Sequence, residues 1–194
     1  AYNGDSCEVL KEIETESIHL SCYSPPFADL YTYSASERDL GNSKNWTEFF
    51  EHYSFIIREL LRVTKSGLLT CVHTADVPAM SSRDGYMGMK DFPGHIIQAH
   101  EKEGFIYHSK TCIWKDPLTA ATRTHAIGLA HKQIVKDSAL CRMGIADYIV
   151  AFRKRGDNPK PIRNENGLTV YHGEKKIPAN LEGYFGKDIH PSVN

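Results

Sequence analysis

The residue types with the clearest chemical potential are four consecutive ones, Ser24-Pro25-Pro26-Phe27. They follow an apolar run, residues 18–23, that predicts a short buried strand. Neither proline can donate a backbone hydrogen bond and both have a fixed φ, so the strand must end abruptly here. The resulting stiff turn presents carbonyl oxygens, a hydroxyl group and an aromatic ring. Rigid loops at strand ends are where α/β proteins usually place their chemistry.

This turn has the groups needed to bind an aromatic amine. The Ser24 hydroxyl and the Pro25 carbonyl oxygen can both accept hydrogen bonds from one planar amino group, while Phe27 stacks on the ring that carries it. Accepting both protons keeps the nitrogen lone pair out of conjugation, so the nitrogen becomes a better nucleophile toward an electrophilic methyl group. An amine inside a nucleic acid duplex would have to be flipped out to reach the turn.

The composition is that of a globular chain with one sizeable core. The chain has 194 residues, of which 41% are hydrophobic and 24% charged, and a formal net charge of −1. Such values are usual for one soluble domain, and they leave nucleic acid binding to a local basic patch. The apolar runs are too short to cross a bilayer, and the first residues do not resemble a signal peptide. We therefore expect a cytoplasmic protein without a membrane partner.

The cysteines and histidines give no pattern typical of a metal site. The five cysteines are odd in number and include no Cys-x-x-Cys pair, which favours a reducing compartment and argues against a zinc ribbon. Cys22 and Cys71 lie in apolar runs, so we expect them to be buried. No His-x-x-x-His pair lies on a predicted helix with a carboxylate partner, and His95 and His100 are five residues apart. We expect no metal ion.

Alternating helices and strands predict a three-layer α/β domain. The helical period is clearest from about residue 45 to residue 64, and Gly67 is predicted to end this helix. A shorter helix is expected from Ser6, which could cap it. Continuous apolar strands are typical of sheets covered on both faces. The remaining expected elements are strands at 17–23, 68–74, 104–115 and 146–154, a helix at 94–103, and loops at 28–44 and 77–93.

After residue 155 the chain becomes rich in turn residues and poor in apolar ones. Little in this part would form a core. We therefore predict an α/β region over residues 1–155, followed by a turn-rich peripheral lobe or extended arm over residues 156–194.

The motif and its surroundings resemble the amino-group DNA methyltransferases, which use S-adenosylmethionine. Their catalytic motif is Asp, Asn or Ser, then Pro-Pro and an aromatic residue. Serine in the first position resembles the cytosine-N4 branch, whereas aspartate is usual in adenine-N6 enzymes. The opening Asn3-Gly4-Asp5 also resembles the start of such domains. Further segments resemble phage and prophage DNA methylases: residues 36–43, the helix from Trp46, and residues 114–117, 131–138 and 147–148.

The resemblance covers residues 3 to about 155 and implies a Rossmann-like methyltransferase fold of the permuted type, with the catalytic motif first. It implies that the catalytic residues are Ser24, Pro25, Pro26 and Phe27. It further implies that Asp5, together with Ser24 and Pro25, lies near the cofactor S-adenosylmethionine. Capping of the first helix is an equally open role for Asp5.

A basic segment, residues 115–142, is the candidate contact with double-stranded DNA. Its cationic side chains could bind phosphates or read base edges, although a solvated surface is the alternative. A homodimer is left open. The candidate DNA-binding residues are Lys115, Arg123, His131, Lys132, Lys136 and Arg142.

The sequence lacks one feature that the resemblance implies. The family uses a Phe-x-Gly-x-Gly turn near the methionine part of the cofactor, and no segment of this chain fits it. In the permuted order this turn follows the recognition region, so we expect an incomplete fold from the N-terminal part of a longer enzyme, inactive by itself. Two alternatives to cytosine-N4 methylation stay open: adenine-N6 methylation, and a non-catalytic DNA-binding or scaffold module with a methyltransferase-like fold.

Overall fold

The computed structural model describes residues 4–28, 30–116, 135–140 and 146–161. The chain divides into two units, residues 1–159 and 160–194, and all elements below belong to the first. The boundary expected near residue 155 stays a prediction. Most of the expected lobe or arm, residues 162–194, lies outside the described residues.

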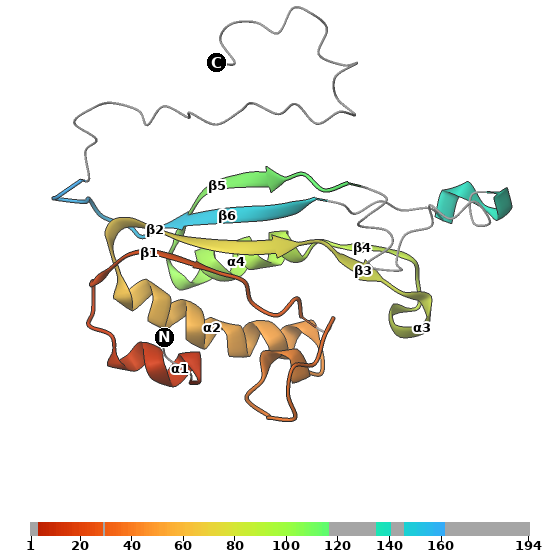
Figure 1. Ribbon diagram of the computed structural model, residues 1–194, viewed down its shortest axis with the longest axis horizontal. Coiled ribbons are helices and arrows are strands. Elements are labelled where there is room, and N and C mark those ends of the chain that lie inside the picture. The colour runs from red at the N-terminus through yellow and green to blue at the C-terminus, as the bar shows by residue number, and fades with distance from the viewer. Residues whose placement is uncertain (1–3, 29, 117–134, 141–145, 162–194) are drawn as a thin grey trace, which may run out of the picture. The chain divides into compact units, whose positions relative to one another are not determined.

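In the described part of the chain, four strands form one sheet in the order β1-β2-β6-β5 (Figure 1). The parallel pair is β1 with β2, whereas β6 runs antiparallel to both β2 and β5. The ends of β1, β2 and β5 therefore meet at the same edge of the sheet as the start of β6. The strands are β1 (Ile18–Tyr23), β2 (Thr64–Ala75), β5 (Ile106–Ile113) and β6 (Asp147–Arg153). All four predicted strands are confirmed, with shifted bounds.

The helices α2 (Trp46–Val63) and α4 (Phe92–Glu103) pack against each other on one face of the sheet, and α1 (Ser6–Val9) packs beside α2 (Figure 1). The apolar face predicted for α2 is confirmed, because its buried residues recur at the helical period. Burial of each such side chain contributes about 2 kcal/mol. The core includes Phe49, Tyr53, Ile57, Phe92, Ile96, Val72, Val150 and Phe152.

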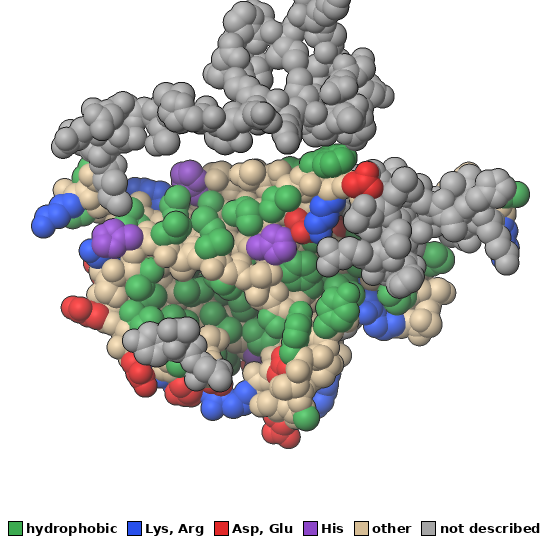
Figure 2. Space-filling view, in the orientation of Figure 1, with side chains coloured by type: hydrophobic (Ala, Val, Ile, Leu, Met, Phe, Trp, Pro, Cys, Tyr) green, Lys and Arg blue, Asp and Glu red, His purple; other side chains and the backbone are tan. Residues whose placement is uncertain are grey.

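The opposite face of the sheet is largely open among the described residues. Leu20 is 61% exposed, and most of β5 is exposed as well. Cys22 is exposed and Cys71 half-buried, so the expectation that both are buried is wrong. Figure 2 shows hydrophobic side chains at the surface in the region of the sheet. The mixed α/β class is confirmed, but the described helices supply a layer on one face only.

Gly67 does not end α2, contrary to the sequence prediction. The helix ends at Val63, Thr64 is already extended, and β2 begins there directly. Gly67 lies inside β2 with φ 76°, next to a shift in the β1–β2 register between Ile18 and Leu20. Glycine at positive φ suits a β-bulge as well as a helix end, so the residue type alone did not distinguish them.

The segment 77–93, expected as a loop, contains regular structure. It includes β3 (Val77–Ala79) antiparallel to β4 (Gly88–Lys90), with α3 (Ser81–Asp84) between them. Three-residue strands give too short a pattern to be recognised by periodicity. Short 3-10 helices occur at Leu10–Glu12, Leu40–Asn42 and Ser138–Leu140.

Two helices begin at aspartate caps. Capping by Asp5, one of its two open roles, is confirmed, whereas Ser6 as the cap of α1 and Gly94 as the start of α4 are wrong. Asp5 caps α1 through a 2.8 Å hydrogen bond from the Cys7 N–H, so Ser6 lies within the helix. Asp91 caps α4 by accepting from the Gly94 N–H at 2.7 Å. The helix therefore includes Pro93, which is tolerated in a first turn because its missing N–H has no helical partner there.

Neither a bilayer span nor a metal cluster occurs in the described ranges. No helix there is long and apolar enough to cross a membrane. No three His, Cys, Asp or Glu side chains there come together as a metal site would require.

A line of buried hydrogen bonds supports the last residue of β1. The Tyr23 hydroxyl lies 2.6 Å from the Tyr53 hydroxyl and 3.2 Å from His100 Nε2, and His100 Nδ1 lies 2.8 Å from the Ile96 carbonyl oxygen. A carbonyl only accepts, so Nδ1 of neutral His100 donates and Nε2 accepts from Tyr23. The His100 ring also stacks on Phe152, with centroids 3.9 Å apart. Burial lowers the pKa of His100 to about 4.

We predict that His100 makes the protein less stable in mild acid. Its folded pKa of about 4 lies below the ordinary value of 6.5, so the unfolded chain binds the extra proton between these pH values. The free energy of unfolding should therefore fall, by roughly 3 kcal/mol, as the pH is lowered through this window. Urea denaturation at several pH values measures it. His100→Gln should flatten this slope, and His108→Gln, on exposed β5, should keep it; equal slopes would contradict the prediction.

Candidate active site

The Ser24–Phe27 turn leaves the sheet where the sequence predicted. β1 ends at Tyr23, and the turn lies at the edge where β2 ends and β6 begins. Ser24 is exposed, whereas Pro25 is buried and Phe27 half-buried. The diproline turn is thus anchored on its inner side and accessible at the serine. We call Ser24–Phe27 the diproline corner.

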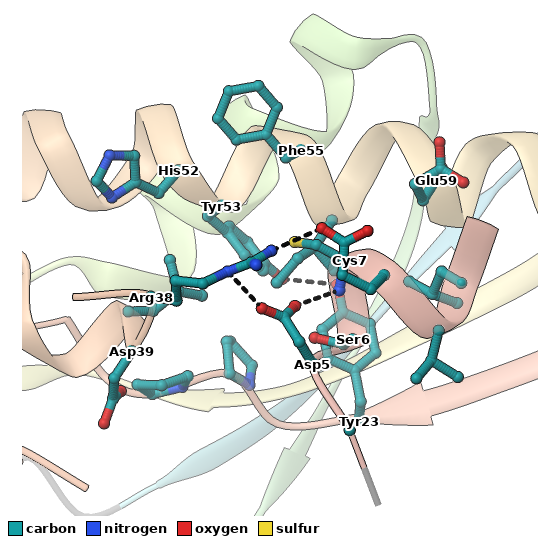
Figure 3. Close-up of a pocket in the computed structure, with 18 of the residues that line it drawn as sticks. Asp5, Ser6, Cys7, Tyr23, Arg38, Asp39, His52, Tyr53, Phe55 and Glu59 are labelled. Carbon is teal, nitrogen blue, oxygen red and sulfur yellow. Dashed lines mark hydrogen bonds and ion pairs between the residues drawn. The ribbon is translucent and has the colours of Figure 1, made fainter. Parts of the chain in front are cut away.

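A large cavity of about 1100 Å³ lies on one side of the diproline corner (Figure 3). Its lining comes from α1, from α2 and from the loop that contains Arg38 and Asp39. Ser24 and both prolines of the corner also line it. A space of this size can hold a nucleoside-sized ligand.

Charged side chains surround one part of this large cavity. Arg38 Nε lies 2.8 Å from Asp5 Oδ2, and Arg38 Nη2 lies 2.7 Å from Glu8 Oε1 (Figure 3). The hydrogen bond from Arg38 lowers the pKa of Glu8. Burial raises the pKa of the Cys7 thiol, which keeps it neutral. The cavity therefore offers carboxylates and a guanidinium group side by side.

A smaller cavity of about 610 Å³ also borders the diproline corner, and Ser24, Pro25 and Pro26 line both spaces. Its other lining residues include Phe27 and two exposed aromatic residues, Tyr31 and Tyr33. This small cavity is bounded by aromatic rings and therefore suits a flat, stacking ligand.

Phe27 has one side packed against the protein and still contributes to the small cavity. Its ring centroid is 5.8 Å from that of Phe92 and 5.9 Å from that of His73. Neither Phe27 nor Ser24 is turned away from the cavities. Their catalytic roles are not tested by this geometry and stay predictions.

Sequence reasoning missed two polar residues next to Ser24. Ser24 Oγ lies 3.2 Å from His73 Nδ1, and His73 Nε2 lies 3.0 Å from Asp147 Oδ2. His73 follows a mostly apolar stretch of β2, residues 68–72, and Asp147 is the first residue of β6. Those were the available signals, but the sheet register was needed to bring the two strands together.

The candidate DNA-binding residues are only partly described. Lys115 Nζ lies 2.5 Å from Asp147 Oδ2, so it belongs to the polar group at the diproline corner. Lys136 is exposed. Arg123, His131, Lys132 and Arg142 lie outside the described residues. A DNA-binding role for all six stays a prediction.

Comparison with known proteins finds matches by structure rather than by overall sequence. No protein-family model and no curated protein sequence matches this chain. A putative DNA modification methylase from Thermus thermophilus shares 20% sequence identity, with a TM-score of 0.56, over 82% of this chain and 54% of that chain. Its complex with S-adenosyl-L-methionine gives 22% identity and a TM-score of 0.56, over 82% and 55%.

A second solved structure is similar in the same way. The PvuII DNA methyltransferase, which is cytosine-N4-specific, shares 18% identity with a TM-score of 0.53, over 78% of this chain and 48% of that chain. This chain therefore spans about half the length of these proteins. It shares the α/β fold of these methyltransferases, and this fold class is the one that the sequence predicted. The partial match agrees with the incomplete fold expected.

We predict that Asp147 contributes to stability as the shared partner of two cationic or polar groups. Asp147 is 8% exposed, and Asp147→Ala would leave Lys115 and His73 without their carboxylate. The free energy of unfolding should fall by about 1–3 kcal/mol, because removing the largely buried carboxylate leaves two partly buried donors without their acceptor. Lys11→Ala, which removes an exposed ion pair with Glu8, should cost less than about 1 kcal/mol. Urea denaturation compares them; equally small losses would contradict the prediction.

Proposed function

We propose that this protein takes part in the S-adenosylmethionine-dependent methylation of the exocyclic amino group of a flipped DNA base, with cytosine N4 as the favoured target. The observation that carries the proposal is that Ser24, Pro25 and Pro26 line two cavities at once. A methyl donor in one cavity and an amine in the other would meet at these residues. The Thermus methylase that was solved with S-adenosyl-L-methionine and the cytosine-N4-specific PvuII enzyme support this function.

On the base side, the diproline corner would hold the amine and the aromatic rings would hold the base. The Ser24 hydroxyl and the Pro25 carbonyl oxygen would accept the two amino hydrogens. Phe27 would stack on the base, and Tyr31 and Tyr33 line the same small cavity. Stacking of this kind contributes about 1–3 kcal/mol per base. This orientation would leave the nitrogen lone pair free for attack.

On the cofactor side, the large cavity has the size and charge for S-adenosylmethionine. When bound, this cofactor supplies a methyl group on a positively charged sulfur. Its amino acid end carries an ammonium and a carboxylate group, which complement Asp5 and the adjacent Arg38 guanidinium. Asp5, with Ser24 and Pro25, would hold the cofactor. Since the sequence has no Phe-x-Gly-x-Gly turn, we propose that the described chain supplies one side of this site.

DNA would reach the diproline corner along the basic segment. We propose that Lys136, together with Arg123, His131, Lys132 and Arg142, contacts phosphates or bases. Lys115, whose Nζ contacts Asp147 Oδ2, would act near the diproline corner. Phosphate contacts of this kind orient a duplex without selecting its sequence.

The absence of the glycine-rich turn from the sequence favours a second candidate function. A chain that retains the fold without a complete cofactor site could bind DNA or act as a scaffold without transferring a methyl group. Calorimetric titration of the complete reading frame with S-adenosylmethionine discriminates the two functions, because only the enzyme should release or absorb heat.

We predict that Ser24→Ala lowers kcat for methyl transfer to DNA by about 100-fold or more, because one acceptor of the amine is lost. The measurement is mass spectrometry of nucleosides from DNA treated with the complete reading frame. The matched control is Ser54→Ala, whose hydroxyl lines neither cavity and donates to the Glu51 carbonyl oxygen on α2. Wild-type turnover in Ser24→Ala would remove the proposed role, and N6-methyladenine as the product would overturn the assignment to cytosine.

We predict that Asp5→Asn weakens binding of S-adenosylmethionine by about 10-fold, or about 1.4 kcal/mol, because the amide carries no charge for the ammonium group. Asparagine caps helices as well as aspartate does, so α1 should persist. Isothermal titration calorimetry gives the affinity. Glu14→Gln, an exposed carboxylate away from the cavity lining, is the control. An unchanged Kd in Asp5→Asn would leave Asp5 as a helix cap only.

A further inference from the structure

Near the diproline corner, each of the four strands contributes one polar residue, which lies within the strand or shortly after it. Ser24 follows β1, His73 is near the end of β2, Lys115 follows β5, and Asp147 begins β6. Their side chains form a continuous series of contacts: Ser24 Oγ to His73 Nδ1 at 3.2 Å, His73 Nε2 to Asp147 Oδ2 at 3.0 Å, and Asp147 Oδ2 to Lys115 Nζ at 2.5 Å. The series begins at the hydroxyl that lines both cavities and ends at a half-buried cation.

The partners in this series determine where each hydrogen lies. The Asp147 carboxylate only accepts, so His73 Nε2 must donate to it. In a neutral imidazole the other nitrogen, Nδ1, is then an acceptor, and Ser24 must donate to it. The second neighbour of the Ser24 hydroxyl is the His73 carbonyl oxygen, also at 3.2 Å, and it too can only accept. Whether Ser24 donates to Nδ1 or to the carbonyl oxygen, its hydrogen points toward His73. The lone pairs of the Ser24 oxygen then remain available to accept a hydrogen bond from a ligand in the cavities.

We propose that His73 is a positioning residue that acts through Ser24, both by holding its hydroxyl as an acceptor and by taking up the proton that the substrate nitrogen loses. This inference rests on the methyl transfer proposed above. A hydroxyl that could rotate would donate to the amine's lone pair about as readily as it accepts from the amine. Because the Ser24 hydroxyl donates its hydrogen to His73, it can only accept a hydrogen bond from the amine. This favours the geometry in which the nitrogen lone pair is free.

The proton transfer balances along the same contacts. When the nitrogen–methyl bond forms, the methyl–sulfur bond breaks and its electron pair stays on sulfur. The methylated nitrogen is then positively charged and has a surplus proton. That proton passes to Ser24 Oγ while the Ser24 hydrogen passes to His73 Nδ1. The products are a neutral methylated amine, an unchanged serine and an imidazolium ion beside the Asp147 carboxylate.

The surroundings of His73 suit a temporary positive charge. In the described part of the chain, the charged groups that face it are Asp147 from β6 and, through Asp147, Lys115 after β5. The diproline corner contributes the Ser24 hydroxyl and the Phe27 ring. The His73 side chain is 34% exposed, so the proton can pass on to water. Asp147 therefore orients the imidazole and stabilises its charged form.

The test compares pH profiles of methyl transfer by the complete reading frame. His73→Asn keeps an oxygen acceptor close to the position of Nδ1 but cannot take up a proton. We expect kcat to fall about 10- to 100-fold, KM for DNA and cofactor to stay within about 2-fold, and the acidic limb of the wild-type profile to disappear. His73→Leu, which also removes the acceptor, should lose more activity than His73→Asn. His108→Asn, on exposed β5, should keep the wild-type profile.

Nitrogen NMR of the histidine rings tests the same inference without turnover. We expect neutral His73 to be protonated at Nε2, and Asp147→Asn to change this tautomer. Protonation at Nδ1 would overturn the inference, as would a wild-type kcat and pH profile in His73→Asn, and both results would leave methyl transfer itself intact. An inactive wild-type protein that binds no S-adenosylmethionine would instead reject the proposed function, and the proton transfer with it.

Discussion

The structure around the candidate site depends on one constraint: two consecutive prolines cannot continue a strand. The β1 ladder stops at Tyr23 because Pro25 and Pro26, which follow Ser24, lack the N–H that pairing requires. Since β2 runs parallel to β1, and β6 antiparallel to β2, the chain leaves the sheet at an edge where other strands also end or begin. The same edge therefore collects polar groups from elements far apart in the sequence. This is the usual place for chemistry in open α/β sheets.

The last residue of β1 and the first residue of the diproline corner have opposite environments. Tyr23 is held from the inside by Tyr53 and neutral, buried His100. Ser24 faces outward and contacts His73, which has a carboxylate partner and partial access to solvent. Buried neutral groups with satisfied hydrogen bonds resist rearrangement. We infer that the inner hydrogen bonds fix the end of β1, so that the outer ones can orient a single hydroxyl.

Sequence patterns predicted a helix or strand correctly where neighbouring residues alone determine whether it forms. The period of α2 was enough because one face of a long helix must be buried, and Phe49, Tyr53 and Ile57 are buried as expected. The prediction that Gly67 ends α2 was wrong because glycine at positive φ occurs both at helix ends and at β-bulges. Only the pairing of β2 with β1 distinguishes the two cases. Continuous apolar strands suggested two covered faces. The described helices nevertheless pack on one face only, because covering a sheet depends on elements elsewhere in the chain.

The sequence by itself determined the stiff turn at Ser24–Phe27, since the absence of proline N–H groups acts on the neighbouring residues regardless of the rest of the fold. It also determined the resemblance and the α/β class. Only the tertiary structure decided which side chains meet the turn. His73 is 49 residues from Ser24, and Asp147 is 74 residues from His73. Strand order and register bring them within hydrogen-bond distance, and these are set by packing between distant segments, which no local pattern encodes.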